Sequence, residues 1–172
     1  MEEDESSQIG KVTKFPRLKL KIKTSNLLET YIPSHLNFDM LANIILNHTL
    51  LVANQNTYRL CEIEMYYCGT EHNDKYVHCS IEQSMNGRFY FHKYGTCTYK
   101  SGTYKGLDIT LGPNSQTYFG VLIRSVRNQN TGQFIEGPCR CVNELLSQFE
   151  CTEVSQFVKD KEIPLKIYDT TY

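Results

Sequence analysis

Glu62, Glu64 and Tyr66 follow one another at every second position of a stretch that reads as a β-strand. Alternate side chains of a strand point to the same face, so these three side chains are expected to share one face. A carboxylate on the inner face of a strand, beside aromatic rings, is suited to act as a general base that activates water. The alternative is an exposed polar face that carries no chemistry.

Residues 87–95, Gly-Arg-Phe-Tyr-Phe-His-Lys-Tyr-Gly, combine aromatic rings with positive charge. The rings offer stacking surfaces for nucleobases, and Arg88 and Lys93 are suited to hold phosphate. The alternative is an ordinary aromatic strand of a protein core. The pattern therefore indicates either an RNA contact or core packing.

The segment 100–108, Lys-Ser-Gly-Thr-Tyr-Lys-Gly-Leu-Asp, is predicted to form a loop framed by Lys100 and Lys105. Its two glycines allow tight turns or a close approach of the backbone to a ligand. The residue order of a Walker phosphate-binding loop is absent. Arg124 ends the apolar stretch 120–124, and it either reaches solvent from a sheet edge or projects into a site.

Other kinds of catalytic centre find little support in the sequence. No arrangement of serine, histidine and aspartate, or of cysteine and histidine, indicates a nucleophilic triad. The five histidines lack the spacing of metal ligands, and the seven cysteines form no CxxC pair. An odd number of cysteines without an export signal predicts reduced thiols. We therefore expect no metal and no cofactor.

Charge is unevenly distributed along the chain. The 172 residues include 18 Lys and Arg against 19 Asp and Glu, a net charge of −1, which argues against a general polyanion binder. Residues 11–23 nevertheless carry six basic residues and no acid, and residues 88–127 carry six basic residues and one acid. This segregation favours a local, shaped fit to nucleic acid.

The order of elements predicts an α+β fold. Residues 1–10 are expected to be a mobile acidic tail, followed by a single globular domain over 11–172. The alternating segment 17–23 predicts a strand, either an edge protected by lysines or a cationic face that lies on phosphate. Helices are predicted at 34–51 and 143–149, and further strands at 58–67, 89–94, 121–126 and 163–168.

Strands and helices do not alternate regularly, which favours a curved, largely antiparallel sheet flanked by a few helices. No apolar run approaches the ~18 residues of a membrane-spanning helix. The acidic N-terminus lacks the apolar core of a secretory signal. These features predict a cytoplasmic protein without a membrane segment.

Taken in order, several of these segments resemble the methylpurine (3-methyladenine) DNA glycosylases over about residues 36–146. The likeness rests on 41–50, Cys61 to Tyr66, Gly120 to Arg124, and Glu136-Gly137-Pro138. It implies that Glu64 is the catalytic carboxylate and Tyr66 a base-stacking ring. It also implies a pocket made of Glu64, Tyr66, His78, Phe91, Tyr94, Asp108 and Arg124.

The chain departs from that family in three places. The basic segment that precedes the aromatic strand is reduced to 81–86, and the loop 100–108 is longer. Asp108 stands where the family uses an asparagine to screen bases. An added carboxylate there is expected to change which base is admitted.

A closer resemblance is to a divergent eukaryotic branch, the microsporidian ribosome dormancy factors. It rests on Phe-His-Lys-Tyr-Gly at 91–95, Gly-Thr-Tyr-Lys-Gly-Leu-Asp-Ile-Thr at 102–110 and Leu-Ile-Arg at 122–124. It implies a non-catalytic monomer in the E site of the idle 80S ribosome, which contacts rRNA and ribosomal proteins, excludes deacylated tRNA and inhibits translation. The residues expected to meet RNA are Lys11, Lys14, Arg17, Lys19, Lys21, Lys23, Arg88, Lys93, Lys100, Lys105 and Arg127. The alternatives are a glycosylase-like base-excision enzyme and a module that binds only proteins or a small molecule.

Overall fold

The computed structural model describes residues 37–70, 72–95, 97–159 and 163–170. The predicted acidic tail at 1–10 and the predicted strand at 17–23 lie outside these residues. Every candidate RNA contact between Lys11 and Lys23 lies outside them as well.

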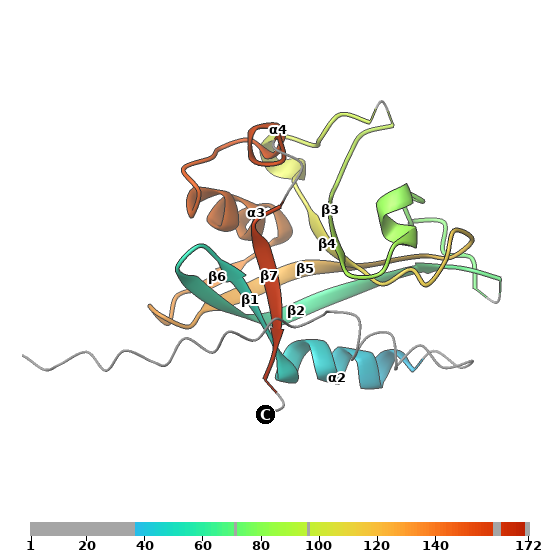
Figure 1. Ribbon diagram of the computed structural model, residues 1–172, viewed down its shortest axis with the longest axis horizontal. Coiled ribbons are helices and arrows are strands. Elements are labelled where there is room, and N and C mark those ends of the chain that lie inside the picture. Colours follow the sequence, from blue (N-terminus) through green and yellow to red (C-terminus); the bar gives the residue numbers. More distant parts are fainter. Residues whose placement is uncertain (1–36, 71, 96, 160–162, 171–172) are drawn as a thin grey trace, which may run out of the picture.

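One antiparallel sheet forms the centre of the described part (Figure 1). Its strands follow the order β3-β4-β5-β2-β1-β7, and β6 pairs with β5. The strands are β1 (Thr49–Ala53), β2 (Asn56–Cys68), β3 (Arg88–Phe91), β4 (Leu107–Thr110), β5 (Tyr118–Asn128), β6 (Phe134–Glu136) and β7 (Leu165–Asp169). The predicted α+β class with an antiparallel sheet is confirmed.

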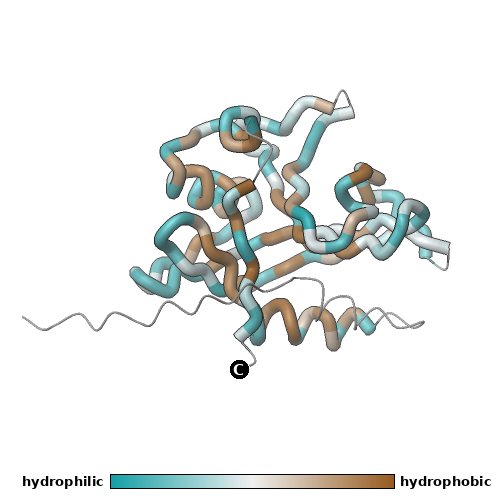
Figure 2. Tube along the Cα trace, in the orientation of Figure 1, coloured by the Kyte–Doolittle hydropathy of each residue, from teal (hydrophilic) through white to brown (hydrophobic). Residues whose placement is uncertain are grey.

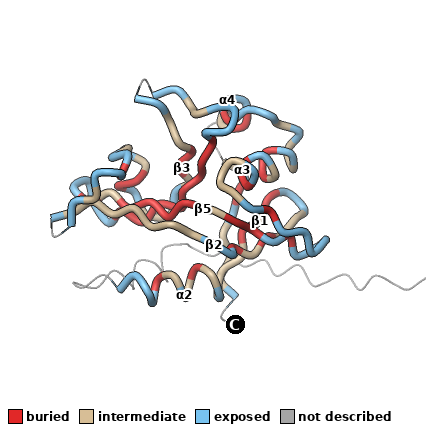
Figure 3. The backbone as a smooth tube through the Cα atoms, turned by 180° about the vertical axis from the view of Figure 1, so that it is seen from behind, coloured by how far each residue is buried: buried red, intermediate tan, exposed pale blue. Residues whose placement is uncertain are grey.

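Helices lie on both sides of this sheet (Figures 1 and 3). Helix α2 lies on one side, and α3 and α4 lie on the other. The helices are α2 (Phe38–His48), α3 (Pro138–Ser147) and α4 (Val154–Phe157), with two short 3₁₀ turns, η1 (Ile81–Ser84) and η2 (Gly102–Tyr104). Figure 2 shows hydrophobic residues along α2 and along the central strands.

Helix α2 is shorter than the predicted 34–51. Asn37 caps its start, because the side-chain Oδ1 accepts a hydrogen bond of 2.9 Å from the Met40 backbone N–H. Leu41 and Ile45, four residues apart, are buried on one face. The helix ends at His48, because the next five residues pair with β2 and β7 as strand β1.

Helix α3 begins earlier than predicted. Gly137 is the N-cap and Pro138 the first residue of the helix, so the predicted start at Asn143 is wrong. Proline suits the first turn, since its fixed φ is helical and its missing N–H would have no partner there. Gly137 has φ 99°, which a glycine adopts without strain.

The alternation along β2 sets the position of the site. Met65 and Tyr67 pack against the hydrophobic core, with the Tyr67 ring centroid 5.5 Å from that of Phe119. The intervening residues, Glu64 and Tyr66, therefore face the opposite side. A β-bulge shifts the pairing with β5 on either side of Glu62, which bends the strand.

Two further findings concern the whole described part. Each of the seven cysteines is a free thiol. Among the described residues, no helix is long and apolar enough to span a bilayer.

Candidate functional site

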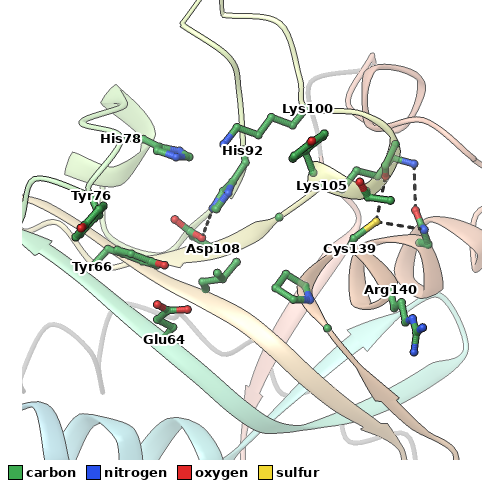
Figure 4. Close-up of a pocket in the computed structure, with 18 of the residues that line it drawn as sticks. Glu64, Tyr66, Tyr76, His78, His92, Lys100, Lys105, Asp108, Cys139 and Arg140 are labelled. Carbon is green, nitrogen blue, oxygen red and sulfur yellow. Dashed lines mark hydrogen bonds and ion pairs between the residues drawn. The ribbon is translucent and has the colours of Figure 1, made fainter.

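An open cavity of about 1060 Å³ lies over β2, β4 and β5, between η1 and the start of α3 (Figure 4). The loop that precedes β4 forms another part of its wall. The ionisable and aromatic residues that line it are Glu64, Tyr66, Tyr76, His78, His92, Lys100, Tyr104, Lys105, Asp108, Glu136, Cys139 and Arg140. Four members of the predicted pocket, namely Glu64, Tyr66, His78 and Asp108, therefore meet in one cavity.

Glu64 is held by an arginine from the neighbouring strand. Its Oε2 lies 2.6 Å from Nη1 of Arg124, and Oε1 of Glu62 lies 3.5 Å from Nε of the same arginine. The two carboxylates share one face of β2, as predicted. Arg124 does not itself line the cavity, but it fixes the carboxylate that does.

Tyr66 lies next to Glu64 on the cavity wall. Its partial burial, together with a hydrogen bond to Glu64 and the charge of that carboxylate, raises the pKa of the Tyr66 phenol to about 12. The phenol therefore stays protonated at neutral pH. It is a hydrogen-bond donor and a stacking surface, not a base.

Asp108 lies at the floor of the cavity and is 1% exposed. Its Oδ1 lies 2.7 Å from Nε2 of His92, and its Oδ2 accepts a hydrogen bond of 3.1 Å from Nε2 of Gln83. Both oxygens of this buried carboxylate thus have a partner, as the burial of a charge requires. The contact with Asp108 fixes the orientation of the His92 ring.

Two imidazoles stand side by side above this floor. The ring centroids of His78 and His92 are 4.6 Å apart, and His78 Nδ1 lies 3.1 Å from the hydroxyl of Tyr90. Partial burial, the neighbouring His92 and the charge of Lys100 lower the pKa of His78 below its usual value. His78 is therefore neutral at physiological pH.

Lys105, which was predicted to meet RNA, is buried in the wall of the cavity. It is 7% exposed, and its Nζ donates hydrogen bonds to Oδ1 of Asn143 (3.0 Å) and to the carbonyl of Thr152 (2.9 Å). These bonds tie the loop before β4 to α3 and to the segment that follows α3. A carboxylate of Glu153 lies 3.9 Å from the same amino group.

The predicted basic segment 88–127 is partly neutralised by folding. Lys93 forms an ion pair with Glu82, Lys105 is buried as described, and Arg124 is held by two glutamates. The acidic partners come from outside the segment, so the linear charge count could not reveal them. Arg88, Lys100 and Arg127 remain without an ion pair in the described part of the chain.

Besides Arg124, two further predicted pocket residues do not line the cavity. Phe91 is buried in the core, where its ring centroid lies 5.7 Å from that of Phe157. Tyr94 is exposed beyond the end of β3. The period of two instead brings Tyr90 and His92 to the cavity side, so the structure does not place Phe91 and Tyr94 in the pocket that the resemblance implies.

Several residues of the site were not predicted from the sequence, chiefly His92, Gln83 and Tyr76. The signal for His92 was available, because it alternates with Phe89 and Phe91 and so faces away from the core. Gln83 lies in the short 3₁₀ turn η1 and Tyr76 in a turn, neither of which is long enough for a periodic pattern, so their positions depend on tertiary packing. Within the described residues, no group of three or more His, Cys, Asp and Glu side chains could hold a metal ion.

The chain is similar to an uncharacterized protein of Acanthamoeba polyphaga mimivirus. The two are 46% identical over 140 residues, which cover 74% of this chain and 65% of the viral protein. This chain therefore spans less than two thirds of its relative's length. No protein-family model and no solved structure matches the chain.

Proposed function

We propose that this chain is a ribosome-binding dormancy factor that acts in the cytoplasm. It occupies the E site of the idle 80S ribosome as a monomer, contacts rRNA and ribosomal proteins, excludes deacylated tRNA and so inhibits translation. The proposal starts from the resemblance to microsporidian dormancy factor one and, more distantly, to the methylpurine-glycosylase fold.

The main observation behind the proposal is the rim of the cavity, by which we mean its exposed lining residues Tyr76, Tyr104 and Arg140. Tyr76 and Tyr104 are 68% and 70% exposed, large values for aromatic side chains, and both line the cavity. Lys75 Nζ lies 5.1 Å from the centroid of the Tyr76 ring, and Arg140 is exposed on the rim. Exposed rings beside cations that form no ion pair with another described residue suit unstacked bases and phosphates of folded RNA.

The state of Glu64 favours binding over catalysis. A general base needs a free lone pair that can reach the proton it removes. Glu64 instead shares its carboxylate between Arg124 and the hydroxyl of Tyr66. Asp108 adds a second carboxylate to the same cavity, and both of its oxygens are already bonded, to His92 and to Gln83.

Base excision is the second candidate, because Glu64, Tyr66 and His78 line one cavity as the glycosylase resemblance implies. A flipped base would stack on Tyr66, and Glu64 would activate water. The assay is excision from alkylated duplex DNA by the wild type and by Glu64→Gln. Activity that the substitution abolishes supports this candidate, and an inactive wild type ends it.

Co-sedimentation with vacant 80S ribosomes tests the main proposal. The full chain should pellet with ribosomes at low salt, and deacylated tRNA should displace it. Neutralising the six basic residues at 11–23 should weaken binding and reduce its salt dependence. A chain that stays in the supernatant at every salt concentration contradicts the proposal.

A matched pair of variants tests the role of the rim. Tyr104→Ala should weaken ribosome binding by about tenfold, the effect of removing one stacked base contact. Phe134→Ala, which removes an exposed ring 49% accessible on β6 outside the cavity, should leave binding unchanged. Equal affinities of the two variants would mean that the rim makes no contact with the ribosome.

A further inference from the structure

A cluster of three nitrogen-bearing side chains, His78, His92 and Lys100, lies inside the cavity; we call it the imidazole–lysine cluster. The two rings are 4.6 Å apart, and Figure 4 shows Lys100 directed toward them. The charge of Lys100 acts on His78 strongly enough to lower its pKa. None of the three belongs to the rim that we propose contacts the ribosome.

The cluster contains polar atoms that are available for hydrogen bonds to a ligand. Within the described part of the chain, the Lys100 amino group takes part in no hydrogen bond or ion pair. His92 Nε2 is occupied by Asp108, which leaves Nδ1 as its second polar atom. Position 106 is a glycine whose missing Cβ would lie 2.6 Å from that Nδ1. The His92 ring therefore packs directly against the backbone of Gly106 and occupies the space that a side chain at position 106 would need.

The opposite wall of the cavity is aromatic and acidic. Tyr66 and Tyr76 present rings, and Glu64 presents a partly exposed carboxylate. Rings stack on nucleobases, and a carboxylate accepts hydrogen bonds from an exocyclic amino group. A ligand that fills the cavity therefore needs a negative group at one end and a flat ring with donors at the other.

We propose that the cavity binds a nucleoside 5′-monophosphate, with its phosphate on the imidazole–lysine cluster and its base along Tyr66 and Tyr76. Ammonium and imidazole donors form short, charge-assisted bonds with phosphate oxygens. The cavity volume of about 1060 Å³ is sufficient for a ligand of this size. The same chemistry is offered by a free nucleotide and by the phosphorylated 5′ end of an RNA strand.

Phosphate binding should be coupled to uptake of a proton. The groups that face His78 are the Tyr90 hydroxyl, His92, Lys100 and Asp108; of these, His92 and Lys100 disfavour its protonation and Asp108 favours it. A dianionic phosphate beside the ring stabilises the imidazolium. Affinity should therefore be higher near pH 6 than near pH 8, since His78 is more readily protonated at the lower value.

Isothermal titration calorimetry of the full chain with AMP tests the inference. AMP should bind at least about tenfold more tightly than adenosine, the effect expected of the phosphate contacts, and more tightly than inorganic phosphate. Lys100→Gln should weaken AMP binding by about tenfold. The matched control is Lys166→Gln on β7, an exposed lysine outside the cavity, which should bind AMP as the wild type does.

His78→Gln gives an independent measurement, because it should abolish the difference in AMP affinity between the two pH values. Equal affinities for AMP and adenosine, or an unchanged affinity of Lys100→Gln, would overturn the inference. Inorganic phosphate that binds as tightly as AMP would overturn the part that concerns the base.

Competition with short RNAs identifies the source of the ligand. An RNA with a 5′-phosphate that displaces AMP, when its 5′-hydroxyl counterpart does not, points to a strand end. AMP binding without competition from either RNA points to a free nucleotide. The inference goes beyond ribosome binding and does not require it, because a chain that fails to pellet with ribosomes can still bind AMP.

Discussion

The carboxylate of Asp108 on β4 occupies the space beside the α-carbon of Gly120 on β5. A Cβ at position 120 would overlap Asp108 Oδ2 and would lie 2.8 Å from Nε2 of Gln83. Asp108 and Gln83 are each 1% exposed, so neither can swing into solvent. A glycine at 120 is therefore a condition for the hydrogen-bonded carboxylate that holds His92.

Gly120→Ala should destabilise the fold. The added methyl group meets two buried polar side chains that already bond each other, so the free energy of unfolding should fall by about 1 to 3 kcal/mol. Urea denaturation followed by circular dichroism measures the change. The control is Gly95→Ala, where a Cβ has no atom within 4 Å. Equal midpoints for the two variants would show that the site can relax around the methyl group.

Lys105→Met should lower stability without affecting RNA contacts. The substitution keeps the length of the side chain but leaves Asn143 and the carbonyl of Thr152 without their donor. The expected cost is about 1 to 3 kcal/mol in thermal or urea unfolding. Lys166→Met, at an exposed position, should change stability little.

Ribosome pelleting of Lys105→Met, at a temperature where the variant is folded, separates the two roles of this lysine. Binding like that of the wild type agrees with the buried position of Lys105. A folded variant that no longer pellets would restore Lys105 to the RNA-binding residues.

His78 should titrate below its ordinary value of 6.5. Since the pKa is lowered in the folded state, the neutral form contributes stability above pH 6.5, and that stability is lost as the pH falls toward the lower folded pKa. NMR titration of the histidine ring protons, assigned with His78→Gln, measures the midpoint. Lys100→Gln should raise it, because the charge of Lys100 is one of the causes. A midpoint at or above 6.5 would contradict the crowding of His78 by His92 and Lys100.

The sequence was sufficient to predict two of the strands that carry the site, β2 and β5. Glu62, Glu64 and Tyr66 alternate along β2 with Ile63, Met65 and Tyr67, which pack against the core, and such a period-two pattern favours a strand. The apolar run that ends near Arg124 likewise lies within β5. These two strands pair directly, which brings Arg124 to Glu64.

Short segments and tertiary partners could not be predicted in the same way. Strands β1 and β4 have five and four residues, too few for periodicity to separate a strand from the end of a helix or a loop. The pairing of Lys93 with Glu82 depends on a 3₁₀ turn that folds back on β3. A linear count of basic residues therefore overestimates the charge that is free for RNA.

The phenol of Tyr66 should ionise at a higher pH than that of an ordinary tyrosine. Partial burial, the hydrogen bond to Glu64 and the charge of Glu64 raise its pKa from 10.0 to about 12. Because the folded pKa is the higher one, the protonated phenol contributes stability that is fully present below pH 10.0 and declines as the pH rises toward about 12. The difference in tyrosinate absorbance between the wild type and Tyr66→Phe, recorded immediately after a jump to alkaline pH, isolates this phenol. Glu64→Gln should lower the midpoint, since it removes the carboxylate that opposes ionisation. A midpoint near 10.0 in the folded protein would mean that Tyr66 is solvated and detached from Glu64, and the aromatic wall assigned to the nucleotide base would then lack its fixed ring.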